Sequence, residues 1–259
     1  MRALRLMRAQ ARLAMIVASH YRLDFLLDGA IELLWVSTAL VPLWVIFGGH
    51  GPIAGWDLSG ALVVVGFFTM LQSIVEGALN PSLVAFADSV RRGTLDSVLL
   101  KPVDAQLWIA TSHLQPWRAT SALSGIAMIA VGASSTPAPS LPSMALSIAL
   151  FFSAIVLAHA IWTLAMCASL VVLGLEGLSD VLMAVLDGAR WPASIYRGAL
   201  RVALTFVVPL GLLTTVPAQA LLGTLSTRSA VAALLEAVVV AIVARVAFRA
   251  AIARYTSAS

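Results

Sequence analysis

Charged residues are scarce in this sequence. Lys, Arg, Asp and Glu form 11% of its 259 residues, whereas 61% are hydrophobic. A soluble domain carries about 25% charged residues, so this chain has too little polar surface to cover a soluble core. Apolar runs of the roughly 20 residues that cross a bilayer recur along it instead, without the alternation of a membrane strand. These patterns predict an all-α integral membrane protein with one transmembrane domain over residues 1–259.

Cysteine clusters and nucleotide motifs are also lacking. The single cysteine, Cys167, lies in an apolar run, so no disulfide can form within the chain. The four histidines are scattered, and none shares metal-ligand spacing with the cysteine. No GxxxxGK[ST] segment is present, although such a loop holds the phosphates of ATP in many ATPases. We therefore expect no catalytic residue, no metal site and no bound cofactor in this chain.

The basic residues predict a topology. The net charge is +4, and we attribute it to Lys and Arg at the cytoplasmic membrane face rather than to nucleic-acid binding. With six spans and both termini in the cytoplasm, every Lys and Arg except Arg228 lies inside. A helix from about Gln106, kinked at Pro116, is expected to lead into the third span. The spans are expected at about 30–49, 59–79, 119–133, 144–173, 199–222 and 230–250.

Residues 174–222 allow a second arrangement. The stretch 174–190 carries several charged residues among apolar ones, and it could itself be the fifth span, facing other helices. Residues 191–222 would then form a Pro-broken re-entrant hairpin on the outer side, which is permitted at membrane depth when protein surrounds it. Both arrangements have six spans, but the second moves three arginines to the outer side.

The first 24 residues have the pattern of an amphipathic helix. Arg2, Arg5, Arg8 and Arg12 fall within one arc of about 120° on a helical wheel, and nearby leucines and methionines fall outside it. Such a helix lies on the membrane surface with its arginines toward anionic headgroups. We expect residues 1–24 to be interfacial, and the alternative is a plain cytoplasmic extension of the first span.

Two ionisable residues fall well inside predicted spans. His159 lies in the middle of the fourth span, and Glu236 lies about two turns into the last one. An ionisable group in a bilayer is costly, so it faces protein or a wet cavity and is a functional candidate. Both residues are therefore candidates for a substrate path, and the alternative for each is a hydrogen bond between helices.

The loop 80–106 differs from the other loops because it mixes charges with leucines. Apolar residues at helical spacing continue the second span as a helix to about residue 91, and Gly93 ends that helix. Thr94 is expected to cap a second short helix, which Pro102 ends. This helix would present Leu95 and Leu99 to a protein socket, and contact with lipid alone is the alternative. The predicted contact residues are Arg91, Arg92, Gly93, Leu95, Asp96, Leu99, Lys101 and Pro102.

Two segments carry a recognisable pattern. One is Arg92-Gly93-Thr94-Leu95-Asp96 followed by Leu99-Leu100-Lys101-Pro102-Val103, and the other begins at Trp191 and reads WPASIYRGALRVALTFVVPLGLLTTVPAQALLG. The first resembles the cytoplasmic signature of ABC-2-type transporter permeases. The second is similar to the late region of one bacterial subfamily, the ABC-2 family transporter proteins, in its spaced prolines and final Leu-Leu-Gly. The likeness extends over nearly the whole chain.

This resemblance implies a fold and a function. The fold would be a six-helix permease with an N-terminal amphipathic connecting helix, a cytoplasmic coupling helix in loop 80–106 and an outer re-entrant hairpin before the last helix. Two separate ATPase subunits would bind ATP and Mg²⁺ and drive export, and a second permease, identical or related, would complete a dimer. The cargo would be a small or amphipathic compound, cationic in some proposals, and the location the bacterial cytoplasmic (inner) membrane.

Two other functions stay open from the sequence. A secondary transporter could use an ion gradient through Glu236, although no inverted repeat is evident. An intramembrane lipid-modifying enzyme could use His159 with a buried acid, although no nucleophile and base stand at a supporting spacing. The first would transport without ATP, and the second would act as a purified chain without nucleotide.

Overall fold

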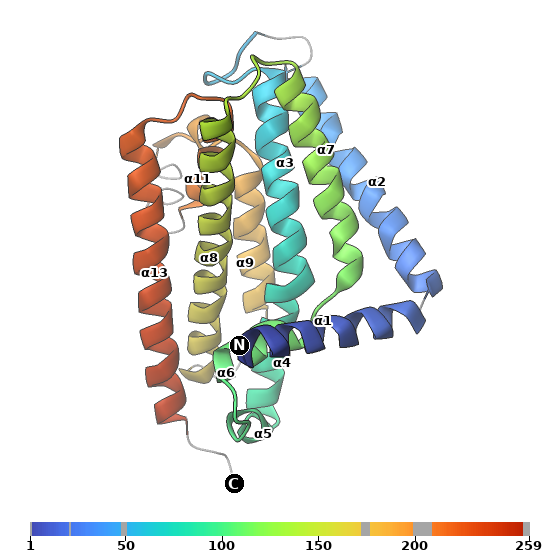
Figure 1. Ribbon diagram of the computed structural model, residues 1–259, viewed down its shortest axis with the longest axis vertical. Helices are drawn as coiled ribbons and strands as arrows, with labels where there is room; N and C mark the ends of the chain where they lie inside the picture. The colour runs from blue at the N-terminus through green and yellow to red at the C-terminus, as the bar shows by residue number, and fades with distance from the viewer. Residues whose placement is uncertain (1, 21, 48–50, 172–176, 199–208, 256–259) are drawn as a thin grey trace.

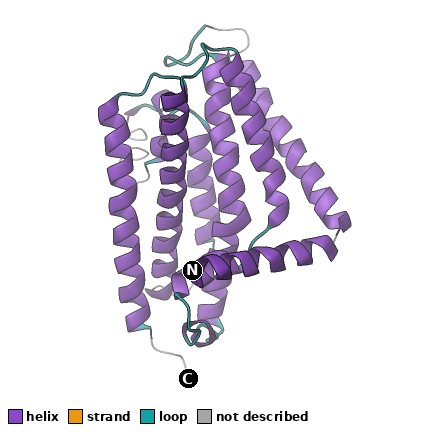
Figure 2. Cartoon of the chain, viewed as in Figure 1, coloured by secondary structure: helices purple, strands orange, loops and turns teal. Residues whose placement is uncertain are grey.

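The described residues of the computed structural model are mostly helical and contain no β-strand (Figures 1 and 2). Three of the described helical stretches are long and apolar enough to cross a membrane: Leu58–Arg91, Leu141–Leu170 and Thr227–Arg254. The expected all-α membrane class is thereby confirmed. The described residues are 2–20, 22–47, 51–171, 177–198 and 209–255.

The chain begins with two helices that meet at an angle. Helix α1, Arg2–His20, runs across one end of the bundle, and α2, Arg22–Phe47, rises along its side next to α7 (Figure 1). The side chain of Thr111 donates a hydrogen bond to Gln10 of α1, which fixes α1 against α6, Ala105–Ser112. Helix α1 therefore lies beside the segment that follows the predicted contact loop.

The centre of the bundle is α3, Leu58–Ile74, packed against α7, Ala119–Ser134. Glycines let the two backbones approach closely, as small residues do between membrane helices. A Cβ on Gly125 would lie 2.6 Å from the Gly66 carbonyl oxygen, and one on Gly66 would lie 2.8 Å from the Gly125 carbonyl oxygen. Neither position can therefore carry a side chain unless the helices separate.

This close approach predicts a strong effect of substitution at Gly125. Gly125→Val is expected to lower the free energy of unfolding by about 1–3 kcal/mol or more, because overpacking here pushes against backbone atoms. Gly51→Val is the matched control, since a Cβ on Gly51 would meet nothing within 4 Å. Thermal unfolding of the two variants in detergent, followed by tryptophan fluorescence, measures the difference. Equal midpoints would contradict the close packing of α3 on α7.

Two long helices form the other side of the bundle. Helices α8, Leu141–Val171, and α13, Thr227–Arg254, lie parallel and side by side (Figure 1). The buried face of α13 consists largely of alanines, whereas only 22% of its most apolar 18-residue window is buried. A large apolar surface of α13 therefore faces outward, as expected of a helix in contact with lipid. Helix α13 therefore packs along α8 mainly through small residues.

Short helices replace one long span in the described part of residues 191–222. Helix α9, Leu178–Asp187, is followed by η3, Gly188–Arg190, and η4, Ala193–Ile195. Helices α11, Leu210–Leu213, and α12, Thr215–Leu221, have four and seven residues, far fewer than the roughly 20 that cross a bilayer. The described residues thus favour the re-entrant hairpin over a continuous fifth span in this region, while residues 199–208 lie outside the described part.

Hydrogen bonds fold this region back on itself. Thr214 Oγ1 donates to the Ala189 carbonyl oxygen at 2.7 Å, and the Ala193 backbone N–H donates to Thr215 Oγ1 at 3.1 Å. Trp56 Nε1 donates to Ser194 Oγ at 3.0 Å, which joins the region to the loop before α3. The described residues of this region therefore lie at the end of the bundle opposite to α1 and to α5, Asp96–Leu99 (Figure 1).

Candidate functional site

A π-helical turn marks the place where the central span begins to leave the bundle. This turn, η1, covers Val75–Leu79 and joins α3 to α4, Asn80–Arg91. Pro81 has no backbone N–H, so it cannot donate to the Gly77 carbonyl oxygen four residues earlier. That oxygen instead accepts the backbone N–H of Gln115 at 2.8 Å. The proline in the span thus frees a carbonyl that binds a segment 38 residues further along the chain.

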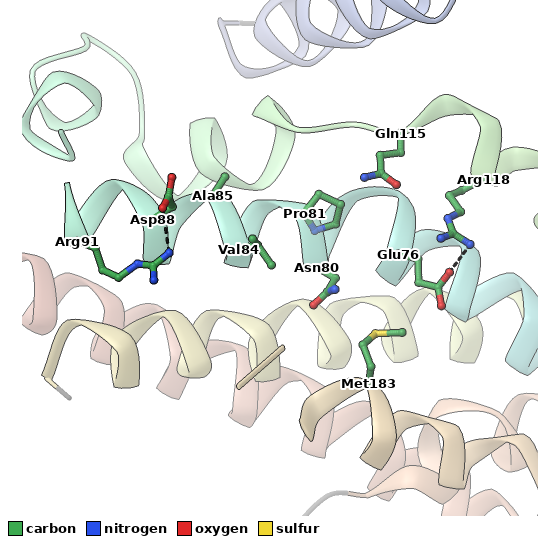
Figure 3. A pocket seen from close by; sticks show the side chains of 10 residues that line it. All are labelled: Glu76, Asn80, Pro81, Val84, Ala85, Asp88, Arg91, Gln115, Arg118 and Met183. Carbon is green, nitrogen blue, oxygen red and sulfur yellow. Dashed lines mark hydrogen bonds and ion pairs between the residues drawn. The ribbon is translucent and has the colours of Figure 1, made fainter. Parts of the chain in front are cut away.

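Side chains reinforce the same junction. Arg118 Nη1 lies 2.5 Å from Glu76 Oε2, with only 26% and 18% of the two side chains exposed (Figure 3). Ser73 Oγ donates to the Arg118 carbonyl oxygen at 2.5 Å. We call Ser73, Glu76, Gly77, Gln115 and Arg118 the neck. The chain leaves the bundle and returns to it through the neck, so residues 80–114 form a closed unit with a fixed base.

A cleft opens beside the neck. It has a volume of about 600 Å³, within the range of small-molecule sites, and Figure 3 shows the side chains around it. Charged pairs stand at both ends, Glu76 with Arg118 and Asp88 with Arg91, and Met183 of α9 closes one side. The lining residues are Glu76, Asn80, Pro81, Val84, Ala85, Asp88, Arg91, Gln115, Arg118 and Met183.

The far end of the closed unit is a compact turn that we call the coupling tip, Gly93–Val103. It contains α5, Asp96–Leu99, and projects from the bundle below α4 (Figure 1). Gly93 has φ +66°, a conformation that favours glycine, and it ends α4 as the sequence predicts. Thr94 does not cap α5 as predicted. Its hydroxyl donates back to the Ser89 carbonyl oxygen at 3.4 Å, and Leu95 is the residue that precedes α5.

The two leucines predicted as anchors are placed differently from that prediction. Leu95 is 0% exposed and belongs to the hydrophobic core of the chain itself, so it cannot enter a partner's socket in this conformation. Leu99 is half-buried against the same core. Leu100, which was not among the predicted contacts, is 85% exposed. Leu100 is therefore the most exposed apolar side chain of the coupling tip.

The predicted polar contact residues surround the tip. Arg91 and Arg92 both pair with Asp88, at 3.0 and 2.9 Å, and remain 52% and 72% exposed. Lys101 Nζ lies 3.6 Å from the ring centre of Trp108, a cation–π contact that holds the lysine over α6. Asp96 is half-buried and Pro102 is exposed. The two exposed arginines therefore lie at the base of the tip, and Lys101 is held over α6.

A contact that sequence reasoning missed lies where the tip ends. Asp104 Oδ1 accepts the Leu107 backbone N–H at 3.1 Å, which caps α6, and the same carboxylate pairs with Arg245 of α13. The hydrogen bond from Arg245 holds the pKa of Asp104 below its usual range. The sequence did carry one signal, since a basic residue within a long apolar helix requires a partner. The identity of that partner, 141 residues away, is not readable from sequence.

The two candidates for a substrate path lie elsewhere. His159 of α8 is near Gln106, with 3.4 Å between His159 Nε2 and Gln106 Nε2, so it makes the interhelical contact that was the alternative for it. Glu236 is half-exposed on α13, beside the outward apolar residues Leu235 and Val239. Neither residue lines the cleft beside the neck. His159 does lie near the end of the coupling tip, because Gln106 stands three residues beyond Val103.

Comparison with known proteins identifies a family for this chain. A family model described as ABC-2 family transporter protein matches residues 33–259, which is most of the chain. The match includes the neck, the cleft and the coupling tip, and leaves out α1 and the first turns of α2. No curated protein and no solved structure gives a significant match.

Proposed function

The chain belongs to the family of ABC-2 transporter proteins, and on that premise we propose that it is the transmembrane subunit of an ATP-binding-cassette exporter. The observation that carries the proposal is the coupling tip. It projects from the bundle on a closed base, with Leu100 85% exposed and the exposed arginines Arg91 and Arg92 at its base. An exposed leucine and exposed arginines on a projecting segment fit a contact with another protein, since arginine is enriched at protein interfaces.

Charge supports the proposed orientation. The coupling tip, α1 and the end of α13 lie at the same end of the bundle (Figure 1), and this end carries most of the arginines. We assign it to the cytoplasm and assign both termini there, in the bacterial inner membrane. The six proposed crossings are α2, α3 with α4, α7, α8, the segment that contains α9, and α13.

The proposed assembly has two permeases and two ATPase subunits. ATP and Mg²⁺ are bound by the ATPase subunits, and their closure moves the coupling tip. The second permease is identical or related to this chain. The cargo is a small or amphipathic compound, and the volume of the cleft beside the neck is compatible with that size.

Leu100→Glu tests the contact with the ATPase. The variant is expected to reduce copurification of an ATP-hydrolysing subunit by about thirtyfold, the effect of losing a central interface residue worth 2 kcal/mol. Leu141→Glu is the matched control. Leu141 is 83% exposed like Leu100, but it is the first residue of α8 and lies at the end of the bundle away from the coupling tip. The measurement is the amount of the ATPase subunit, and its ATPase rate, on the tagged chain purified from native membranes.

Two outcomes would overturn the proposal. One is the absence of any ATP-hydrolysing subunit from the purified native chain, with cargo movement driven by an ion gradient alone. The other is an equal yield of the ATPase subunit with Leu100→Glu and Leu141→Glu.

A further inference from the structure

Arg245 joins the end of the coupling tip to the last helix. Its Nη1 atom donates to Asp104 Oδ1 at 3.1 Å and to Gln106 Oε1 at 2.6 Å, and its Nη2 atom pairs with Asp104 Oδ2. The planar guanidinium thereby bonds two acceptor side chains at once, which fixes its orientation toward them as well as its distance from them. A lysine ammonium at this position would not fix the orientation of the contact in this way, because it is a point charge on a flexible side chain.

Gln106 extends this contact to α8. Because Arg245 can only donate, the side-chain oxygen of Gln106 must face it, and the amide nitrogen then faces α8. That nitrogen lies 3.3 Å from Thr163 Oγ1 and 3.4 Å from His159 Nε2. Thr163 is fully buried, and its hydroxyl donates to the His159 carbonyl oxygen at 2.8 Å. One glutamine at the start of α6 is thus bonded to both long helices.

The contact is poorly suited to stabilising the fold by itself. The side chains of Arg245 and Asp104 are 33% and 42% exposed, and ion pairs this open contribute little to stability. What the contact adds to the packing of α13 on α8 is a direct link from α13 to the residue that follows the coupling tip and to the start of α6. Near this level α13 is also held by Phe248, whose ring centre lies 6.2 Å from that of Phe86 on α4.

We propose that Arg245, Asp104 and Gln106 form a strut that carries movement of the coupling tip to α13 and α8. This inference rests on the proposed function and adds positioning residues to it. Asp104 directly follows the tip, so a displacement of the tip pulls on Arg245. Helix α13 has 28 residues and a length of about 42 Å, so it conveys that displacement to its other end, beside the outer hairpin.

Hydrogen exchange on the purified chain tests the strut without a partner. Leu95→Ala loosens the tip, and in the native background it is expected to speed amide exchange in the half of α13 near Arg245 about twofold or more. In an Arg245→Ala background the same change is expected to add nothing, because the connection is already cut. If Leu95→Ala increases amide exchange in α13 equally in both backgrounds, the proposed strut is wrong.

The assembled transporter supplies the second test. Trapping with ATP and vanadate is expected to change exchange in α13 of the native chain and of Arg249→Ala, which lies one turn further along the same helix. With Arg245→Ala the ATPase subunit is expected to stay bound while the change in α13 is lost. Asp104→Asn keeps the cap of α6 and removes the charge, so an intermediate change is expected. A full nucleotide-dependent change with Arg245→Ala overturns the strut, whereas failure to bind any ATPase subunit contradicts the proposed function instead.

Discussion

Arg118→Ala is expected to destabilise the folded chain by about 3 kcal/mol. Breaking a buried ion pair from one side costs about 3–5 kcal/mol because the remaining charge is left uncompensated. Glu76 is only 18% exposed, so its carboxylate would keep little water when Arg118 is removed. The cost falls at the lower end of the range because the cleft admits some solvent to the neck.

The control for this prediction is Arg92→Ala. Arg92 pairs with Asp88 at 2.9 Å, but its side chain is 72% exposed, and surface pairs contribute about 0–1 kcal/mol. The double variant Glu76→Gln with Arg118→Ala should recover part of the loss, since no unpaired charge stays behind. Unfolding temperature and the monodisperse fraction in detergent measure all three. If Arg118→Ala is as stable as Arg92→Ala, the neck is not a fixed base.

Leu95→Ala is expected to open the coupling tip while leaving the bundle folded. Removing a fully buried leucine costs about 2–5 kcal/mol, and the tip is small enough for that loss to be local. A cost of 2 kcal/mol raises the open population about thirtyfold. Leu100→Ala should change it little, since Leu100 is 85% exposed.

Limited trypsin digestion can measure this opening. Arg91 and Arg92 precede Gly93 at the base of the tip, while Lys101 is followed by Pro102, a bond that trypsin leaves intact. Cleavage after Arg92 should therefore rise in proportion to the open population when opening is faster than cutting. Equal rates for Leu95→Ala and Leu100→Ala would show that Leu95 does not hold the tip together.

The sequence predicted the outline of the coupling tip because its ends are marked locally. Gly93, with a positive φ, ends α4, and Pro102 lacks the N–H that a helix would use, so these two residues mark the limits of the tip in the sequence. The side chain that faces inward does not follow, because a four-residue helix has too few turns to show a periodicity. Leu95 and Leu100 look alike in sequence, and only packing against α6 and the core distinguishes them.

The fifth crossing shows a different limit of sequence reasoning. Counting basic residues favoured a continuous span at 199–222, because it kept Arg190, Arg197 and Arg201 on the cytoplasmic side. In the structure Arg190 pairs with Asp187 at 3.2 Å, and its guanidinium lies 5.0 Å from the ring centre of Phe68. A charge that the protein compensates locally gives little information on topology. The strut could not be predicted either, because Arg245 is distant from Asp104 and Gln106 in the sequence and only the tertiary fold brings them into contact.

The π-helical turn at Val75–Leu79 sets the direction in which the coupling tip points. Such a turn holds one residue more than an α-helical turn, and each residue rotates a helix by about 100°. The face that α3 turns toward α7 is therefore out of phase with the face that α4 turns toward α6 and α8. If these five residues instead continued as an unbroken α-helix, α4 would be rotated relative to α3 by about that angle. The coupling tip would keep all its residues but would project from a different side of α4.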